Sequence, residues 1–188
     1  MIVLQGSSPQ GVYTLWSERE RSLLFATEED KRTAYGGATP LFLGKPLETW
    51  HPLRLIAEAD KLGIQVGDFT FCHAIPNFPA FSSRAVDAMH DVLERFGQLL
   101  PLETDVGPYW AYNVTNVIDV LDRQASKIKM FKGRILEIER MRFRQDAIEG
   151  QFVFKIPETV GSAAYVTEAF RSIVHRSGLS GFFFRVTE

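Results

Sequence analysis

The sequence has little cysteine, no long apolar run and no large excess of charge. Cys72 is the only cysteine among 188 residues, which excludes an intramolecular disulfide and a zinc site built on several cysteines. No stretch approaches the ~20 apolar residues of a membrane-spanning helix, and the first residues lack the basic and apolar regions of a secretory signal. The net charge of −2 does not favour nucleic acid as a partner. We therefore expect a cytoplasmic protein that binds neither a membrane nor nucleic acid.

Motifs of the common catalytic sites are also missing. No glycine-rich segment has the form of a phosphate-binding loop, and no Gly-x-Ser-x-Gly nucleophile motif occurs. The four histidines lie far apart, and no two of them have the i, i+4 spacing of a helical zinc site. These observations argue against an enzyme, a cofactor and a metal.

The composition is that of a globular domain rich in phenylalanine. Apolar residues make up 45% of the chain, and 15 residues are Phe. A chain of this length and apolar content buries a hydrophobic core. The charge is uneven, because residues 61–125 carry a net charge of −4 and residues 126–188 carry +4. The acidic middle suits a basic partner, although charges of this kind also simply keep a surface soluble.

Two segments have the periodicity of amphipathic helices. In 83–96 the apolar residues recur on one face, with Ser82 or Ser83 as the N-cap and Gly97 as a left-handed terminator. The segment 167–177 is the second helix. It starts with Thr167 as its cap and ends at Gly178, after which Leu179 folds back onto the last turn.

Several short segments rich in β-branched and aromatic residues predict strands. They are 12–16, 53–57, 68–72, 109–121, 135–144, 152–156 and 182–186. Within 109–121 the residues from Val117 onward either continue the strand or form one turn of helix. The segments 135–144 and 152–156 are expected to form an antiparallel hairpin, with a bulge near Arg140. Loops are expected over 35–40 and 74–80 because of their glycines and prolines. Together these elements predict an α+β fold, in which two main helices pack against a mostly antiparallel sheet.

Asp119 and Asp122 are the carboxylates that most invite a chemical interpretation. Two nearby carboxylates bind a divalent cation or divide acid and base roles, as in a metal-dependent hydrolase. However, Asp122 is followed by Arg123 and Ser126, which also fits a structural aspartate that accepts local backbone N–H groups. The structural interpretation is favoured, and the hydrolase is kept as an alternative.

The tryptophans invite a binding interpretation. Trp50 lies in a proline-rich loop, where its ring is either tucked beneath the loop or offered to a partner. Trp16 and Trp110 lie on strand patterns and are expected in the core. With the acidic residues Asp105, Asp119 and Asp122, Trp50 completes the set of candidate partner contacts.

Short pieces follow one another in a definite order from Trp50 to Val186. They are Trp50-His51-Pro52, Asp68-Phe69, Phe81-Ser82-Ser83-Arg84, Leu99-Leu100-Pro101-Leu102, residues 112–122 with Ser126, residues 152–157, and residues 177–182. This order resembles immunity protein family eleven of bacterial polymorphic-toxin systems, long catalogued only as a domain of unknown function. The first 45 residues match poorly. We therefore expect an N-terminal strand and loop extension over 1–45 and an immunity-protein-like α+β domain over 46–188, together one compact unit.

The resemblance implies a bacterial, cytoplasmic immunity protein that binds a cognate toxin protein and neutralises it by occlusion. It carries over no catalytic residue and no cofactor. The acidic middle would then face a basic surface of the toxin. Two alternatives stay open: a small metal-dependent hydrolase that uses Asp119 and Asp122, and a self-associating scaffold protein, for example a homodimer.

Overall fold

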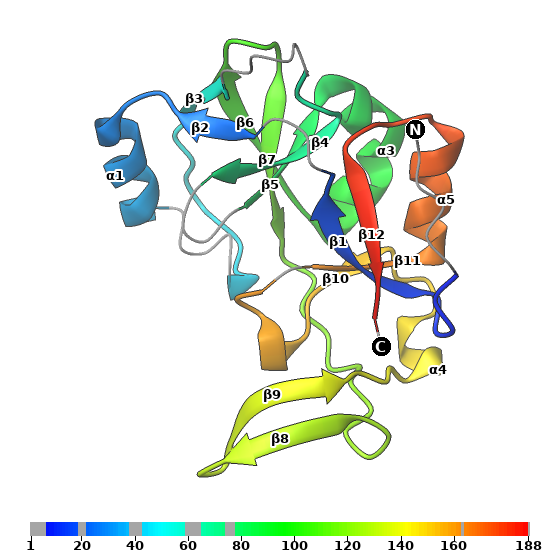
Figure 1. Cartoon of the computed structure of the whole chain (residues 1–188). Helices are drawn as coiled ribbons and strands as arrows, with labels where there is room; N and C mark the ends of the chain where they lie inside the picture. Colours follow the sequence, from blue (N-terminus) through cyan, green and yellow to red (C-terminus); the bar gives the residue numbers. More distant parts are fainter. Residues whose placement is uncertain are drawn as a thin grey trace.

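The computed structural model describes residues 7–18, 22–37, 43–58, 65–73, 78–162 and 164–187. Within these residues the strands form a closed barrel, a four-stranded sheet and a separate two-stranded hairpin (Figure 1). Most neighbouring strands are antiparallel, and α3 (Ser83–Phe96) and α5 (Glu168–Arg176) are the helices that build the core. The predicted α+β class is confirmed. Within the described residues, no helix has the length and apolar character of a membrane span.

The barrel has the strand order β2-β3-β6-β7-β5-β4. Its strands are β2 (Leu23–Phe25), β3 (Arg54–Ala57), β4 (Phe69–His73), β5 (Phe78–Ser82), β6 (Gly97–Thr104) and β7 (Tyr109–Val114). Two pairs, β2–β4 and β3–β6, are parallel and the others are antiparallel. Buried apolar side chains, among them Leu55, Phe78 and Leu100, pack together in a cluster of their own.

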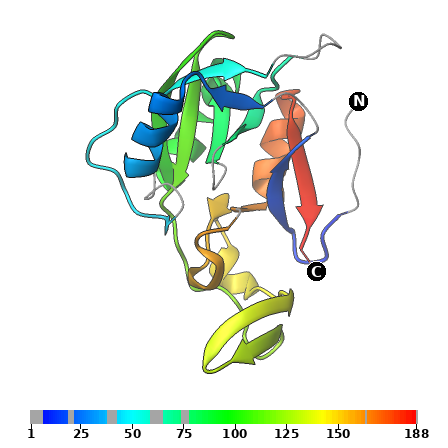
Figure 2. The ribbon, with the colours of Figure 1, turned by 60° about the vertical axis from the view of Figure 1, so that its left-hand side comes forward.

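The four-stranded sheet has the order β10-β11-β1-β12 and is antiparallel throughout. Its strands are β1 (Val12–Ser17), β10 (Val153–Phe154), β11 (Tyr165–Thr167) and β12 (Phe182–Val186). Figure 2 shows β1 and β12 side by side with α5 behind them. Because β1 pairs with both β11 and β12, a strand from the first 45 residues lies inside this sheet.

The remaining elements lie at the periphery. They are α1 (Glu28–Gly37), the hairpin strands β8 (Lys127–Phe131) and β9 (Arg134–Arg140), the short helix α4 (Gln145–Ile148) and the 3-10 turn η1 (Pro157–Thr159). In Figures 1 and 2 the β8–β9 hairpin lies at the end of the molecule away from the barrel. The hairpin is therefore an arm attached to the four-stranded-sheet side of the molecule.

One hydrophobic cluster joins the barrel to the four-stranded sheet. Phe69 and Phe81 come from the barrel, whereas Tyr13, Phe182 and Phe184 come from the sheet, and all are buried. The ring centroids of Phe69 and Phe182 are 4.9 Å apart, and those of Phe69 and Phe81 are 5.2 Å apart. Such aromatic pairs add to the free energy of burial, so this cluster holds the two sheets together.

The two main helices confirm the periodicity that predicted them. The hydroxyl of Ser82 accepts the N–H of Ala85 at 3.2 Å, as an N-cap does. Gly178 has a φ of +58°, and the N–H of Leu179 reaches back to the carbonyl of Val174 at 3.2 Å. Thr167 lies at the N-cap position of α5, but its side chain accepts no backbone N–H of the helix. Its hydroxyl donates to the carbonyl of Gln151 instead.

The prediction that Gly97 ends α3 in a left-handed turn is wrong. Gly97 has an extended φ of −172° and is the first residue of β6. A Cβ at this position would lie 2.4 Å from the carbonyl oxygen of Asn113 and 2.8 Å from the ring of Tyr112. The glycine is therefore required by the close approach of β7, not by a positive φ.

The predicted strands are confirmed more often than their pairing. The segments 12–16, 53–57, 68–72 and 182–186 correspond to observed strands, and the segment 109–121 is a strand only as far as Val114. The hairpin between 135–144 and 152–156 is wrong, because β9 pairs with β8 and β10 pairs with β11. The bulge near Arg140 is confirmed, since the register shifts from the pair Lys127–Arg140 to the pair Ile128–Ile138.

Both expected loops overlap regular structure. Helix α1 continues to Gly37, beginning after Thr27, whose hydroxyl accepts the N–H of Asp30 at 3.1 Å. Strand β5 includes residues 78–80. Pro79 pairs with Phe71 of β4, whereas the pairing of β5 with β7 starts only at Ala80, so the strand tolerates a proline at this position. Residues 38–40 and 74–77 lie outside the described residues.

The carboxylate of Asp68 connects the barrel to the end of α5. It accepts hydrogen bonds from the hydroxyl of Ser82 at 2.8 Å and from the backbone N–H and hydroxyl of Ser180 at 2.9 and 3.0 Å. The guanidinium of Arg84 pairs with it at 2.8 Å and also donates to the carbonyls of Ser177 and Gly178. The carboxylate therefore links β4, the start of α3 and the segment between α5 and β12.

We expect Asp68→Ala to lower the free energy of unfolding by about 2–4 kcal/mol, because hydrogen bonds to a charged group contribute about 1.5–3 kcal/mol each. Urea denaturation followed by circular dichroism measures the loss. Asp105→Ala is the matched control, since the exposed carboxylate of Asp105 accepts one N–H, from Ala57 at 2.8 Å. The control should lose about 0.5–1 kcal/mol. Equal losses in the two variants would contradict the central role of Asp68.

Candidate partner-binding surface

The β8–β9 hairpin begins and ends at a set of polar contacts around Asp122. The carboxylate of Asp122 accepts the N–H groups of Gln124 and Ala125 at 3.0 Å each, which forms a tight turn before β8. Where β9 ends, the N–H of Arg142 donates to the hydroxyl of Ser126 at 2.9 Å. Asp122 therefore has the structural role that its sequence context favoured, and it orients the arm.

A second ion-pair group supports the base of the hairpin. Arg123 lies 3.4 Å from the carboxylate of Asp119 and also pairs with Glu158 of η1. The carboxylate of Asp119 is half-exposed, whereas that of Glu158 is buried. Asp119 thus belongs to the same support as Asp122, although the two carboxylates have different partners.

The tip of the hairpin is a two-residue turn with left-handed geometry. Lys132 has a φ of +48° and Gly133 a φ of +77°, between the paired residues Phe131 and Arg134. Two residues with positive φ are typical of a type I′ turn, whose twist matches that of the strands it joins. The turn therefore gives the arm a defined geometry at its tip.

One face of the hairpin is apolar. Ile128 pairs with Ile138, and Met130 pairs with Ile135. The pair near the base packs against the buried cluster around Phe143. Nearer the tip, apolar side chains are exposed: Met130 is 57% exposed, Phe131 60% and Leu136 70%. Phe131 directly follows Met130 in β8, so the two side chains point to opposite faces of the hairpin. The apolar side chains of the hairpin are thus buried at its base and bare toward its tip.

The other face carries charges that neutralise one another. Lys127 and Lys129 each lie 2.5 Å from the carboxylate of Glu139, and Lys129 lies 3.0 Å from that of Glu137. Hydrogen bonds from Lys127 and Lys129 hold the pKa of Glu139 down to about 2. Residues 127–140 contain five basic residues and two glutamates, a net charge of +3. Lys132, Arg134 and Arg140 form no salt bridge within the described part of the chain.

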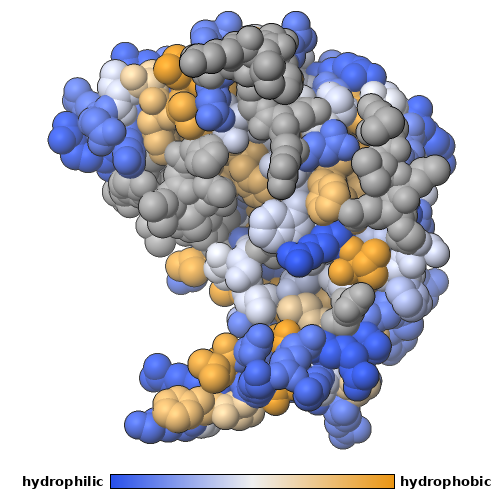
Figure 3. All heavy atoms as spheres, in the orientation of Figure 1, coloured by the Kyte–Doolittle hydropathy of each residue, from blue (hydrophilic) through white to orange (hydrophobic). Residues whose placement is uncertain are grey.

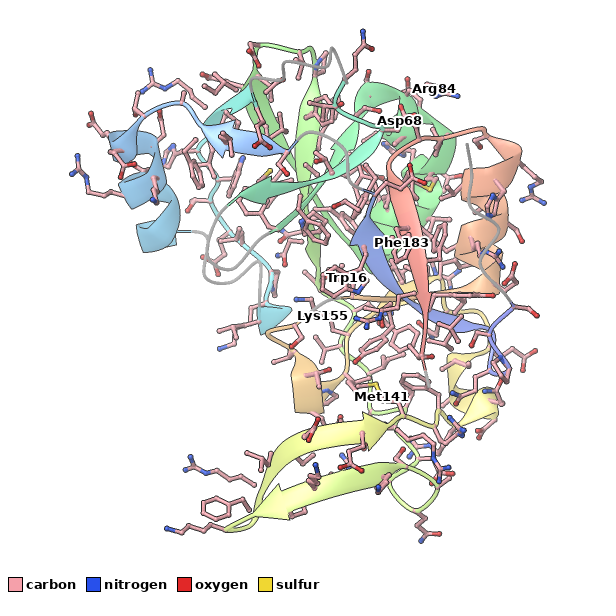
Figure 4. The ribbon with its side chains drawn as sticks, viewed as in Figure 1. Trp16, Asp68, Arg84, Met141, Lys155 and Phe183 are labelled. Atoms are coloured by element: carbon pink, nitrogen blue, oxygen red, sulfur yellow. The ribbon has the colours of Figure 1, made fainter. Side chains whose placement is uncertain are left out.

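The molecule is hollowed between the hairpin and the body, as Figure 3 shows, with apolar residues along the hairpin. Trp16 and Phe183 lie on the sheet above this hollow, with Lys155 beside them (Figure 4). Trp16 pairs with Phe183 across β1 and β12, so both rings lie on the same face of the sheet. Trp16 is 43% exposed and Arg185 lies over its ring at 6.0 Å, so its predicted place in the core is wrong.

Lys155 is a buried cation beside this face. It is 5% exposed, and its Nζ donates to the carbonyl of Val160 at 2.9 Å. Burial lowers the pKa of Lys155 from its ordinary value to about 8. A backbone bridge to Val117 places Lys155 against the segment that follows β7. The alternation of residues along the sequence does not reveal this contact, so it did not distinguish Lys155 from a surface lysine.

The four candidate contact residues fall in two places. The indole N–H of Trp50 donates to the carbonyl of Pro101 at 2.8 Å, and the half-buried ring packs on the barrel interior. Asp105, after β6, belongs to the same barrel. Asp119 and Asp122 lie at the base of the hairpin. Among the described residues no group of three or more His, Cys, Asp or Glu side chains is arranged to hold a metal ion.

Cys72 and the described histidine side chains have local roles. Burial raises the pKa of the Cys72 thiol well above its ordinary value, which keeps it protonated and unreactive. His90 is exposed on α3, 3.3 Å from the carboxylate of Glu94. His175 is half-buried in the last turn of α5, with its ring 6.0 Å from that of Phe184.

One known protein family matches the C-terminal part of the chain. Residues 103–188 match the sequence model of the Immunity protein family (Imm11). The match confirms the resemblance found in the sequence over these residues, which run from the end of β6 to β12 and include the hairpin. Residues 50–102, which the resemblance also covered, lie outside the match. Among curated proteins none matches the chain.

We expect Leu136→Asn to change the free energy of unfolding by less than about 0.5 kcal/mol, because this side chain is mostly in solvent. Phe143→Ala should cost about 3–5 kcal/mol, since Phe143 is 5% exposed and packs against Phe154 and Tyr165. Thermal and urea unfolding of both variants test the contrast. A comparable loss for Leu136→Asn would mean that the tip packs on the body of the molecule.

Proposed function

We propose, from the match of residues 103–188 to the immunity protein family, that this chain binds one cognate bacterial toxin protein and neutralises it by occlusion. The family match is the observation that carries the proposal. The toxin would be a protein encoded beside this chain, and the complex would form in the cytoplasm of the producing cell. The chain would act as a binding protein, without a catalytic residue or cofactor of its own.

Occlusion places physical demands on the surface. Nanomolar binding needs about 12 kcal/mol of net free energy, and an interface of ~1,600 Å² supplies it when a few anchors are well buried. Of the seven exposed large apolar side chains in the described residues, Met130, Phe131 and Leu136 lie on the hairpin. Trp16 lies on the sheet face above the hollow. This concentration of anchors supports a protein partner.

The immunity proposal predicts a stoichiometric partner and protection from it. The full-length chain, tagged and expressed in its native cell, should retain one neighbouring gene product after a moderate salt wash, identified by mass spectrometry. Expression of that product alone should stop growth, and co-expression of this chain should restore it. A partner that leaves growth unaffected, or a retained metal or small molecule in place of a protein, would contradict the immunity proposal.

Asp119→Asn separates inhibition from hydrolysis in the same assay. The carboxylate of Asp119 pairs with Arg123 at the hairpin base, so the neutral variant should keep most of its protective effect. Loss of protection in a folded Asp119→Asn variant that still binds the toxin would favour the hydrolase.

A further inference from the structure

We infer that the β8–β9 hairpin, residues 127–140, is the arm that engages the toxin, and that the toxin surface it enters is concave and acidic. This inference rests on the proposed function, and it names the chemistry of the partner site. It reverses the expectation that an acidic middle segment meets a basic toxin.

The acidic middle segment has structural uses for several of its carboxylates. Asp68 accepts hydrogen bonds from Ser82 and Ser180, Asp105 accepts the N–H of Ala57, and Asp122 forms the turn before β8. Carboxylates occupied in this way are poor candidates for a contact that must be made anew with a partner. We therefore expect the charged groups that attract the toxin to lie elsewhere on the surface.

The hairpin carries the complementary features. Its apolar side chains Met130, Phe131 and Leu136 are more than half exposed, which is the character of an anchor for a partner's pocket. Its glutamates are matched by Lys127 and Lys129, so the three remaining cations, Lys132, Arg134 and Arg140, are available to a partner. A surface that accepts such an arm needs an apolar pocket with carboxylates around it.

The geometry of the hairpin is set before binding. The turn at Lys132 and Gly133, the bulges in the β8–β9 pairing and the contacts of Asp122 at the base all restrict the arm. An arm held in its bound geometry loses less conformational entropy on association, which favours tight inhibition. Figure 1 shows the hairpin at the end of the molecule away from the barrel, an arrangement that suits entry into a concave site of a partner.

Other occupants fit the charges less well. Anionic membranes recruit clusters of about four to eight basic residues, whereas three unpaired cations are present here on a chain of net charge −2. The same net charge disfavours nucleic acid. In a symmetric homodimer built on this hairpin, the basic arms of both copies would share one interface and repel. An acidic protein surface remains the occupant that the charges favour.

Site-specific photo-crosslinking in the native cell tests the location of the interface. The full-length chain carries p-benzoylphenylalanine in place of Phe131, or in place of Val106 or Ile56 as controls of substantial exposure on the barrel. We expect one protein to be crosslinked from position 131 at least about tenfold more than from positions 106 and 56, since crosslinking reports proximity. The crosslinked partner peptide, identified by mass spectrometry, should lie in an acidic segment.

Each outcome of the crosslinking decides between the two proposals. Crosslinks from the barrel positions only, no crosslink from position 131, or crosslinks to a second copy, lipid or nucleic acid would overturn the hairpin assignment. If affinity capture still yields a growth-inhibiting partner in those cases, the immunity proposal stands. An acidic protein crosslinked from position 131 that does not inhibit growth would keep the hairpin assignment and overturn the immunity proposal.

Charge reversal then tests the electrostatic part with the crosslinked protein in purified form. Lys132→Glu combined with Arg134→Glu should slow association about tenfold or more at low salt, and the difference should shrink as salt rises. Arg95→Glu combined with Arg176→Glu changes the net charge equally, at exposed positions on α3 and α5, and should change the rate less than about threefold. Equal effects of the two pairs would contradict an acidic site for the hairpin.

Discussion

The buried carboxylate of Asp68 is the contact on which the arrangement of barrel, helices and sheet depends. It binds Ser82 at the start of α3, Arg84, which is the second residue of that helix, and Ser180 in the segment before β12. Directly beside it, the rings of Phe69, Phe81 and Phe182 pack together. Charge-assisted hydrogen bonds fix directions that apolar packing alone leaves free, so this point sets how the two sheets meet.

The contacts of Asp68 bring together short pieces that lie far apart in the sequence. Asp68-Phe69, Phe81-Ser82-Ser83-Arg84 and residues 177–182 are distant along the chain and meet at this junction. The pieces that meet at this junction have structural roles. The β8–β9 hairpin takes no part in this junction, and under the proposed function the recognition of a toxin falls to such a surface element.

Local features were predictable from the sequence, whereas pairing and exposure were not. Helices α3 and α5 follow from apolar periodicity together with Ser82 and Gly178, which act within one turn. The partner of β9 was missed because β8 is short and rich in lysine, and strand pairing depends on distant residues. A lysine-glycine turn at 132–133, between alternating segments, was the available signal for the hairpin. Trp16 was placed in the core because a strand pattern does not reveal which part of a face stays uncovered.

Hydrogen–deuterium exchange of the full-length chain, alone and with the purified neighbouring gene product, tests the account most directly. Amides of β8 and β9 should gain at least about tenfold protection in the complex, while amides of the barrel strands β3 and β6 change little, because the partner covers the arm and leaves the scaffold as it was. Protection confined to the barrel, with the hairpin exchanging as fast as in the free chain, would contradict it.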